Sequence, residues 1–179
     1  GCFMKTFKTK KYEIVSAKIK KGEIKLAFLS DLHGLEFGQD NSELLQAVRE
    51  FSPDAVLCAG DMLVRSHPDT LGTAQKLLGN LAEEFPVYLS LGNHEYKLLE
   101  AEIYKSMRET YKEYEGQLEA NGVHILHNRH MELTVKENRI FVYGLELPLC
   151  YYDSPLSQTL TEETITGFLG ERKKDFSIL

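Results

Sequence analysis

The sequence predicts an α/β fold, and two observations support this prediction. Short runs at 24–30, 55–59 and 86–91 are apolar on both faces, as strands inside a layered α/β fold are. Stretches with a helical spacing of apolar residues separate and follow these runs. With 179 residues, 42% apolar and 27% charged, the chain is typical of a soluble globular protein, and we expect a single domain over 1–179.

Three helices are expected in the first two thirds of the chain. Asn41 can cap the first, which Pro53 ends, and the second covers about 69–84. The third is predicted as one long helix over about 96–121, ended by Gly122. It carries an aromatic and apolar stripe that favours packing against a sheet over lining a ligand groove. The members of this stripe are Tyr104, Met107, Tyr111, Tyr114 and Leu118.

The pattern changes after Gly122. We expect a tight turn at Glu137 and Asn138, a short helix from Thr161 to about 169, and a last buried strand at 176–179. Before that helix, three consecutive short strands are expected, at 123–126, 131–136 and 139–144.

Charge and cysteine content limit the classes of function. The net charge of −6 argues against general nucleic-acid binding, but bound cations would still allow a phosphorylated substrate. Three cysteines without a CxxC pair favour a reducing compartment. No run approaches the about 18 apolar residues of a membrane span. We therefore expect a cytoplasmic or membrane-associated chain with no transmembrane segment of its own, although an anchor upstream of Gly1 would not be seen.

Polar clusters follow each of the three early strands, at the point where the strand ends. Asp31 and His33 follow the first, Asp61 the second, and Asn93 and His94 the third. Because the carboxyl ends of neighbouring parallel strands meet at one edge of a sheet, these side chains should converge. We interpret their spacing as an extended backbone that sends Asp31 and His33 to the same side.

The residue types in these clusters suit two metal ions. Asp61 could bridge two cations, Asn93 offers a neutral carbonyl oxygen, and His94 adds an imidazole. Mixed carboxylate, amide and imidazole ligands favour Mn, Fe or Zn over calcium. Each motif alone also has a plain structural interpretation, as a strand end or a turn into a helix. Their shared order, each after an apolar strand, favours a site, and neither GxxxxGK[ST] nor GxGxxG occurs as an alternative nucleotide motif.

Together the clusters resemble the signature of the calcineurin-like metallophosphoesterase superfamily, which reads D-x-H, G-D, G-N-H-E, a lone His and G-H-x-H. The stretches 28–34 and 144–149 are similar to a bacterial branch whose members commonly carry a membrane anchor before the catalytic domain. The likeness extends over about 12–179. The matching blocks are Asp31-Leu32-His33, Gly60-Asp61 and Gly92-Asn93-His94-Glu95.

The resemblance implies a layered sandwich of mixed β-sheets flanked by helices, and a hydrolase of phosphate mono- or diesters of small molecules. It implies two divalent transition metals, Mn, Fe or Zn, that activate a bridging water. Asp31 and His33 would hold the first metal, Asp61 would bridge, and Asn93 would hold the second. His94 would be the catalytic residue over the phosphate. Arg65 is expected, by its place in the loop after the second strand, to help hold the phosphate.

The chain departs from the family signature because the lone His and the G-H-x-H block are missing before Leu179. We therefore expect the N-terminal portion of a catalytic domain, C-terminally incomplete, with weak or partial metal occupancy. Apolar residues that would pack against the missing strands would then be exposed, and this exposed apolar surface would favour self-association. The alternative hypotheses are a metal-poor, catalytically inactive partial domain and a non-catalytic binding or scaffold protein.

Four further histidines are candidates for other roles. His124, His127 and His130 are spaced like metal ligands, but they span a predicted strand and turn, so a solvated surface turn is the favoured interpretation. His67 follows Asp61 by six residues, which favours substrate-side contact or plain solvent over metal binding.

Overall fold

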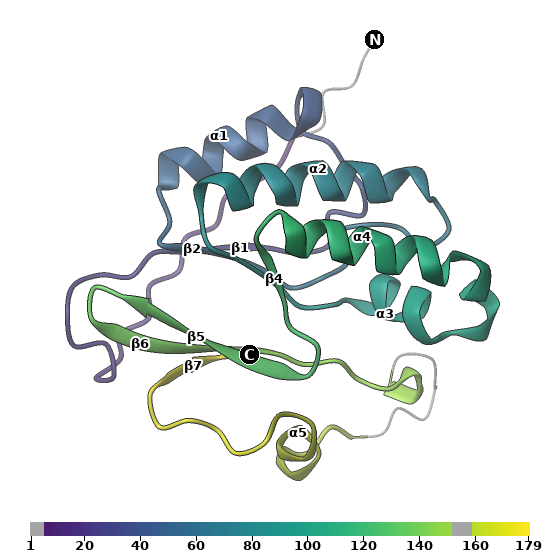
Figure 1. The fold of residues 1–179 in the computed structure, drawn as a ribbon. Coiled ribbons are helices and arrows are strands. Elements are labelled where there is room, and N and C mark those ends of the chain that lie inside the picture. The colour runs from purple at the N-terminus through teal and green to yellow at the C-terminus, as the bar shows by residue number, and fades with distance from the viewer. Residues whose placement is uncertain (1–5, 152–158) are drawn as a thin grey trace.

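Four of the predicted strands pair side by side in one parallel sheet. The structure is a computed structural model that describes residues 6–151 and 159–179. The strands lie in sequence order across the sheet, each hydrogen-bonded to the next (Figure 1). They are β1 (Leu26–Leu29), β2 (Ala55–Cys58), β3 (Val87–Leu89) and β4 (Val123–Ile125).

Helices cover one face of this sheet. α1 (Ser42–Phe51), α2 (Asp69–Glu84) and α4 (Arg108–Ala120) lie together on that side in Figure 1. The short helix α3 (Asn93–Glu100) follows β3, and the 3-10 helix η2 (Glu102–Met107) connects it to α4. The chain thus leaves each of the first three strands through a loop at the same edge of the sheet.

A second, smaller sheet packs against the other face. β5 (Arg129–Val135) and β6 (Asn138–Gly144) form an antiparallel hairpin, and β7 (Phe176–Ile178) pairs parallel to β6, so this sheet is mixed. α5 (Glu162–Leu169) lies outside it (Figure 1). The short 3-10 helices η1 (Gln39–Asn41) and η3 (Leu149–Tyr151) complete the described elements. The α/β class and the layered arrangement of two sheets flanked by helices are therefore confirmed.

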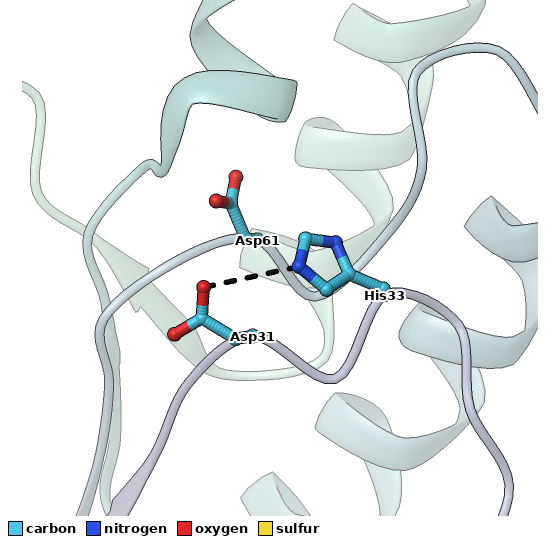
Figure 2. Close-up of side chains that lie close together, drawn as sticks. All are labelled: Asp31, His33 and Asp61. Carbon is cyan, nitrogen blue, oxygen red and sulfur yellow. Dashed lines mark ion pairs between the residues drawn. The ribbon is translucent and has the colours of Figure 1, made fainter.

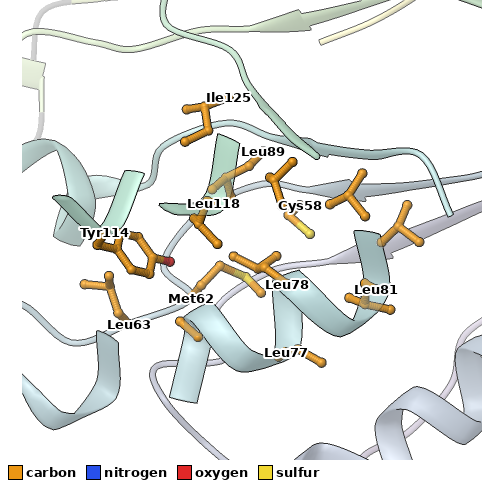
Figure 3. Packing of buried hydrophobic residues seen from close by; sticks show 14 of the residues in the cluster. Cys58, Met62, Leu63, Leu77, Leu78, Leu81, Leu89, Tyr114, Leu118 and Ile125 are labelled. Carbon is orange, nitrogen blue, oxygen red and sulfur yellow. The ribbon is translucent and has the colours of Figure 1, made fainter. Parts of the chain in front are cut away.

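The side chains of β2 explain why its sequence is apolar throughout. Val56 and Cys58 belong to the core between the first sheet and the helices, part of which Figure 3 shows. Ala55 and Leu57 belong to a second core, between the two sheets. Because successive side chains of a strand point to opposite faces, a strand between two layers must be apolar at every position.

The predicted long helix is broken. Ala101 adopts an extended backbone (φ −76°, ψ 130°) and separates α3 from η2, so one helix over 96–121 is wrong. The aromatic stripe nevertheless packs as expected, with Tyr111, Tyr114 and Leu118 buried against the sheet. A helical spacing of apolar residues does not reveal a one-residue break between two segments that share the same buried side.

Three local predictions also need correction. Asn41 does not cap α1 with its side chain, because its Oδ1 accepts a hydrogen bond from the Phe37 amide over 3.0 Å. The hairpin turn lies at Lys136 and Glu137, both with positive φ, one residue earlier than predicted. The strand at 24–30 is not largely buried, since β1 has a neighbour on one side only and Phe28 is 58% exposed.

Among the described residues, we find no helix with the length and apolar character needed to cross a membrane.

Candidate metal centre

Three of the predicted ligands converge where β1 and β2 end. Asp31 and His33 lie in the loop after β1, and Asp61 lies in the loop after β2 (Figure 2). Each offers one ligand atom, and these atoms all lie within 4.8 Å of one another. Asp31 Oδ1 is 3.8 Å from His33 Nε2. In the described part of the chain this is the only such group of three or more His, Cys, Asp or Glu residues.

Backbone hydrogen bonds fix the two loops against each other. The amide of Asp31 donates to the carbonyl of Gly60 over 3.1 Å, and the amide of His33 donates to the carbonyl of Asp61 over 2.9 Å. The amide of Gly34 likewise donates to the carbonyl of Met62 over 2.8 Å. The relative position of the three candidate ligands is therefore set by main-chain contacts and does not depend on flexible side chains.

The three candidate ligands all have left-handed backbone conformations. The φ angles are 56° for Asp31, 49° for His33 and 52° for Asp61. The predicted convergence is thus present, but the extended backbone expected between Asp31 and His33 is wrong. Left-handed residues other than glycine cost about 1–2 kcal/mol each, and such strain gathers at functional sites. Three in one small cluster are consistent with a site shaped for ligand binding.

Two glycines allow the strand-end loops to approach closely. A Cβ at Gly60, whose φ is 82°, would lie 1.9 Å from the amide nitrogen of Gly92. A Cβ at Gly92 would lie 2.4 Å from Asp61. Neither position can accept a side chain. Glycine at both positions therefore allows the loop after β3 to pack against the loop after β2.

Glu95 is a site residue whose role the sequence analysis did not predict. It is fully buried, and its carboxylate accepts hydrogen bonds from the amides of Asp61 (2.9 Å), Met62 (2.8 Å) and Gly92 (3.2 Å). Burial raises its pKa to about 7, although the backbone donors oppose this shift. Its position, three residues after the Gly92 N-cap of α3, is the sequence signal of a capping carboxylate. Glu95 therefore links the loop after β2 to the loop after β3.

Asn93 and His94 begin α3 beside this cluster. The backbone amide of His94 donates to Asp61 Oδ1 over 2.8 Å. Asn93 Oδ1 is buried and has no hydrogen-bond partner among the described residues. A buried acceptor without a partner costs free energy, and a bound cation would remove that cost. The candidate donors are thus two carboxylates, one imidazole and one orphaned amide oxygen, a set that fits divalent transition metals.

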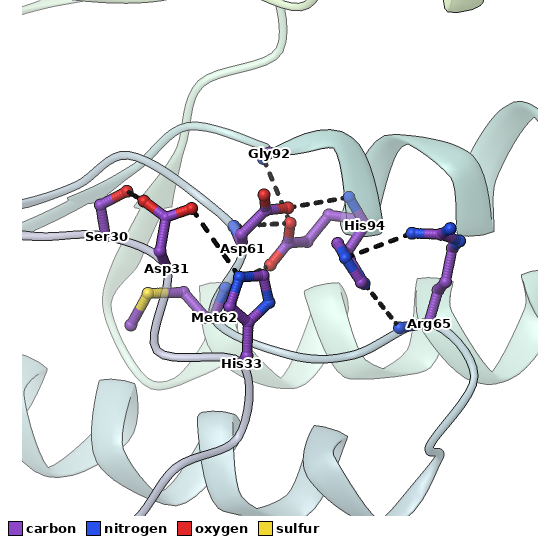
Figure 4. Close-up of polar contacts among 9 residues, drawn as sticks. Ser30, Asp31, His33, Asp61, Met62, Arg65, Gly92 and His94 are labelled. Carbon is purple, nitrogen blue, oxygen red and sulfur yellow. Dashed lines mark hydrogen bonds and ion pairs between the residues drawn. The ribbon is translucent and has the colours of Figure 1, made fainter. Parts of the chain in front are cut away.

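The His94 ring faces both His33 and Arg65. The two imidazole centroids are 5.0 Å apart. The Arg65 amide donates to His94 Nδ1 over 3.1 Å, and Arg65 Nη1 lies 3.2 Å from Nε2 (Figure 4). Desolvation lowers the pKa of His94 below its usual 6.5, with the Arg65 charge adding to this effect and Asp61 opposing it. This shift favours the neutral form of the ring.

His127 is partly exposed but has two acidic partners. Its Nδ1 lies 2.5 Å from Glu146 Oε1 and its Nε2 lies 3.4 Å from Glu115 Oε2. Hydrogen bonds to Glu115 and Glu146 raise its pKa to about 10. The surface turn predicted here thus carries an ion-paired histidine that links α4 to the segment after β6.

The other candidate histidines lie in different surroundings. His124 stacks on Tyr88 with centroids 5.0 Å apart, and His130 packs against Tyr143 at 4.9 Å. His67 is exposed, and its ring contacts the neighbouring Ser66. The solvated surface turn expected for the three spaced histidines is wrong for His124 and His130, which are half-buried in β4 and β5.

Comparison with protein families gives one match, to calcineurin-like phosphoesterases, over residues 24–165. Comparison with curated proteins gives no match. Among solved structures, the chain is similar to the phosphopantetheinyl hydrolase from Mycobacterium tuberculosis, with 19% sequence identity and a TM-score of 0.48. That alignment covers 81% of this chain and 51% of the hydrolase, so this chain spans about half the length of its structural neighbour.

Proposed function

This chain belongs to the calcineurin-like phosphoesterase family, and on that premise we propose that it is the metal-binding part of a hydrolase of small phosphate esters. The observation that carries the proposal is the cluster of Asp31, His33 and Asp61, whose ligand atoms lie within 4.8 Å. Its strained backbone and its fixed loops support a site built for ligands.

We propose two divalent ions at this edge of the sheet. Asp31 and His33 would hold the first, Asp61 would be shared between the two, and Asn93 would hold the second through its orphaned Oδ1. Mn, Fe and Zn suit these donors. When bound, such ions supply a hydroxide from water near neutral pH and neutralise the oxygens of the phosphate. With so few protein ligands, each ion should bind weakly.

His94 and Arg65 form the proposed phosphate side of the site. The Arg65 amide can only donate, so Nδ1 of His94 accepts and the neutral ring carries its proton on Nε2. Arg65 Nη1 is also a donor and lies 3.2 Å from that nitrogen. Two facing donors are stabilised by an acceptor oxygen placed against both of them. A phosphate oxygen fits this position, and the Nε2–H group of His94 can then donate a hydrogen bond that stabilises the charge developing on the leaving oxygen.

Hydrolysis of p-nitrophenyl phosphate and bis-p-nitrophenyl phosphate with added Mn²⁺ tests the proposal. We expect Mn²⁺-dependent turnover that Asp61→Asn and His94→Asn each lower by at least about 100-fold. His67→Asn is the matched control, because this exposed histidine lies near in sequence but contacts Ser66. The rates of p-nitrophenol release from the two substrates also separate monoester from diester preference.

Each other outcome of this assay has a defined meaning. Turnover that survives Asp61→Asn would contradict the proposed metal site. Metal binding without turnover on either substrate would favour a non-catalytic role for this part of the protein. Absence of both would favour the metal-poor, inactive alternative.

A further inference from the structure

The guanidinium of Arg65 lies between Tyr104 and His94. Its Nε donates to the hydroxyl oxygen of Tyr104 over 3.1 Å, and its Nη1 lies 3.2 Å from His94 Nε2. Its Cζ also lies 6.0 Å from the centroid of the Tyr104 ring, within the range of a cation–π contact. Tyr104 is thus the partner of Arg65 on the side away from His94.

From these contacts we infer that Tyr104 is a positioning residue, which sets the Arg65 guanidinium for phosphate binding; the inference rests on the proposed function. The hydroxyl of Tyr104 engages only Nε. The two Nη nitrogens of the Arg65 guanidinium are then left for an acceptor oxygen beside His94. The planar guanidinium presents these two donors in a fixed geometry.

The fold gives Tyr104 a firm position. It lies in η2, where its amide donates to the carbonyl of Ala101 over 3.0 Å, and it packs on the helix-side core. The break at Ala101, which the sequence spacing did not predict, places this residue on a separate turn between α3 and α4. His94 begins α3, so one short segment, 93–107, carries both groups that contact the Arg65 side chain.

The energetic reason for such an anchor is the flexibility of arginine. A free arginine side chain loses rotamer entropy when it is fixed on a ligand. Tyr104 restricts these rotamers before the substrate arrives, so phosphate binding need not do so. Loss of the tyrosine hydroxyl should therefore weaken phosphate binding more than it slows the chemical step.

Phosphate affinity of Tyr104→Phe tests this inference. Inorganic phosphate is titrated by calorimetry into Mn²⁺-loaded wild type, Tyr104→Phe, Arg65→Ala and the double variant. We expect about five- to tenfold weaker phosphate binding for Tyr104→Phe, since a hydrogen bond to a charged group is lost at a partly exposed site. In the Arg65→Ala background the same change should have no further effect. Tyr12→Phe, at an exposed tyrosine, is the matched control.

Steady-state kinetics separate positioning from structural damage. Tyr104→Phe should raise KM by about the same five- to tenfold and change kcat by less than about twofold. A Tyr104→Phe variant with unchanged phosphate affinity and KM, beside an active wild type, would overturn the inference alone. If Tyr104→Phe weakens phosphate binding equally in the wild-type and the Arg65→Ala backgrounds, the inference is also overturned. A wild type that neither hydrolyses phosphate esters nor binds phosphate would overturn the proposed function, and this inference with it.

Discussion

The backbone amide of Arg65 donates to Nδ1 of His94 over 3.1 Å, and this contact fixes the tautomer of the imidazole. The loop after β2 therefore controls the chemistry of the residue that begins α3. An imidazole with its proton on Nε2 presents a donor on the side of Arg65 Nη1, which lies 3.2 Å away.

The tautomer of His94 can be tested directly. We expect ¹⁵N NMR of the metal-free protein to show the neutral ring protonated at Nε2, because Nδ1 accepts the Arg65 amide. Its pKa should lie below 6.5, since desolvation and the Arg65 charge disfavour the imidazolium. The exposed His67 serves as the internal reference. Protonation of the neutral His94 ring at Nδ1 would contradict the described contact.

Glu95→Gln should destabilise the fold. The carboxylate accepts three backbone amides, and a glutamine would turn one acceptor oxygen into a donor that faces an amide. We expect the free energy of unfolding to fall by about 1–3 kcal/mol, measured by urea denaturation. Glu100→Gln, at the exposed end of the same helix, should change it by less than about 0.5 kcal/mol. Equal effects of the two changes would argue against Glu95 as the tie between loops.

His127 should contribute stability that depends on pH. Its pKa rises from 6.5 to about 10 on folding, so the folded state binds the proton more tightly than the unfolded state. The contribution is complete below pH 6.5 and disappears as the pH rises through about 10. We expect His127→Gln to cost about 1 kcal/mol near neutral pH, a small value because the side chain is 39% exposed.

Urea denaturation of wild type and His127→Gln at several pH values between about 6 and 10.5 measures this effect. The difference in unfolding free energy should shrink toward the alkaline end. His67→Gln, at an exposed position, provides the comparison. A difference that stays constant over this range would show that the two glutamates do not stabilise the charged ring.

Tyr114→Phe should not destabilise the protein. The side chain is buried, and its hydroxyl has no hydrogen-bond partner among the described residues. Removing an unpaired buried hydroxyl while keeping the ring should change the free energy of unfolding by between 0 and about +1 kcal/mol. Leu118→Ala, one turn further along the same buried side, should instead cost about 2–5 kcal/mol. A clear loss of stability in Tyr114→Phe would reveal a partner for the hydroxyl.

Much of the fold could be predicted because burial dictates the sequence pattern. β2 lies between two layers and is apolar at every position, while α2 has the predicted bounds of 69–84. The convergence of Asp31, His33 and Asp61 also follows from parallel strand order. These features depend on residue types repeated along the chain, which a single sequence displays.

The remaining features depend on local geometry that residue types do not specify. The left-handed φ of Asp31 and the break at Ala101 involve ordinary residues in conformations set by their surroundings. Tyr104 contacts Arg65, which lies 39 positions away in the chain, and His127 contacts Glu146, which lies 19 positions away. Only the position of Glu95 at the start of α3 gave a usable local signal.

The central claim is that Asp31, His33 and Asp61 bind divalent metal. Titration of Mn²⁺ followed by electron paramagnetic resonance tests it most directly, since free Mn²⁺ gives the signal and bound Mn²⁺ loses intensity. We predict saturable binding by the wild type, weakened at least about tenfold in Asp61→Asn and unchanged in His67→Asn. Equal Mn²⁺ affinity of wild type and Asp61→Asn would contradict the claim.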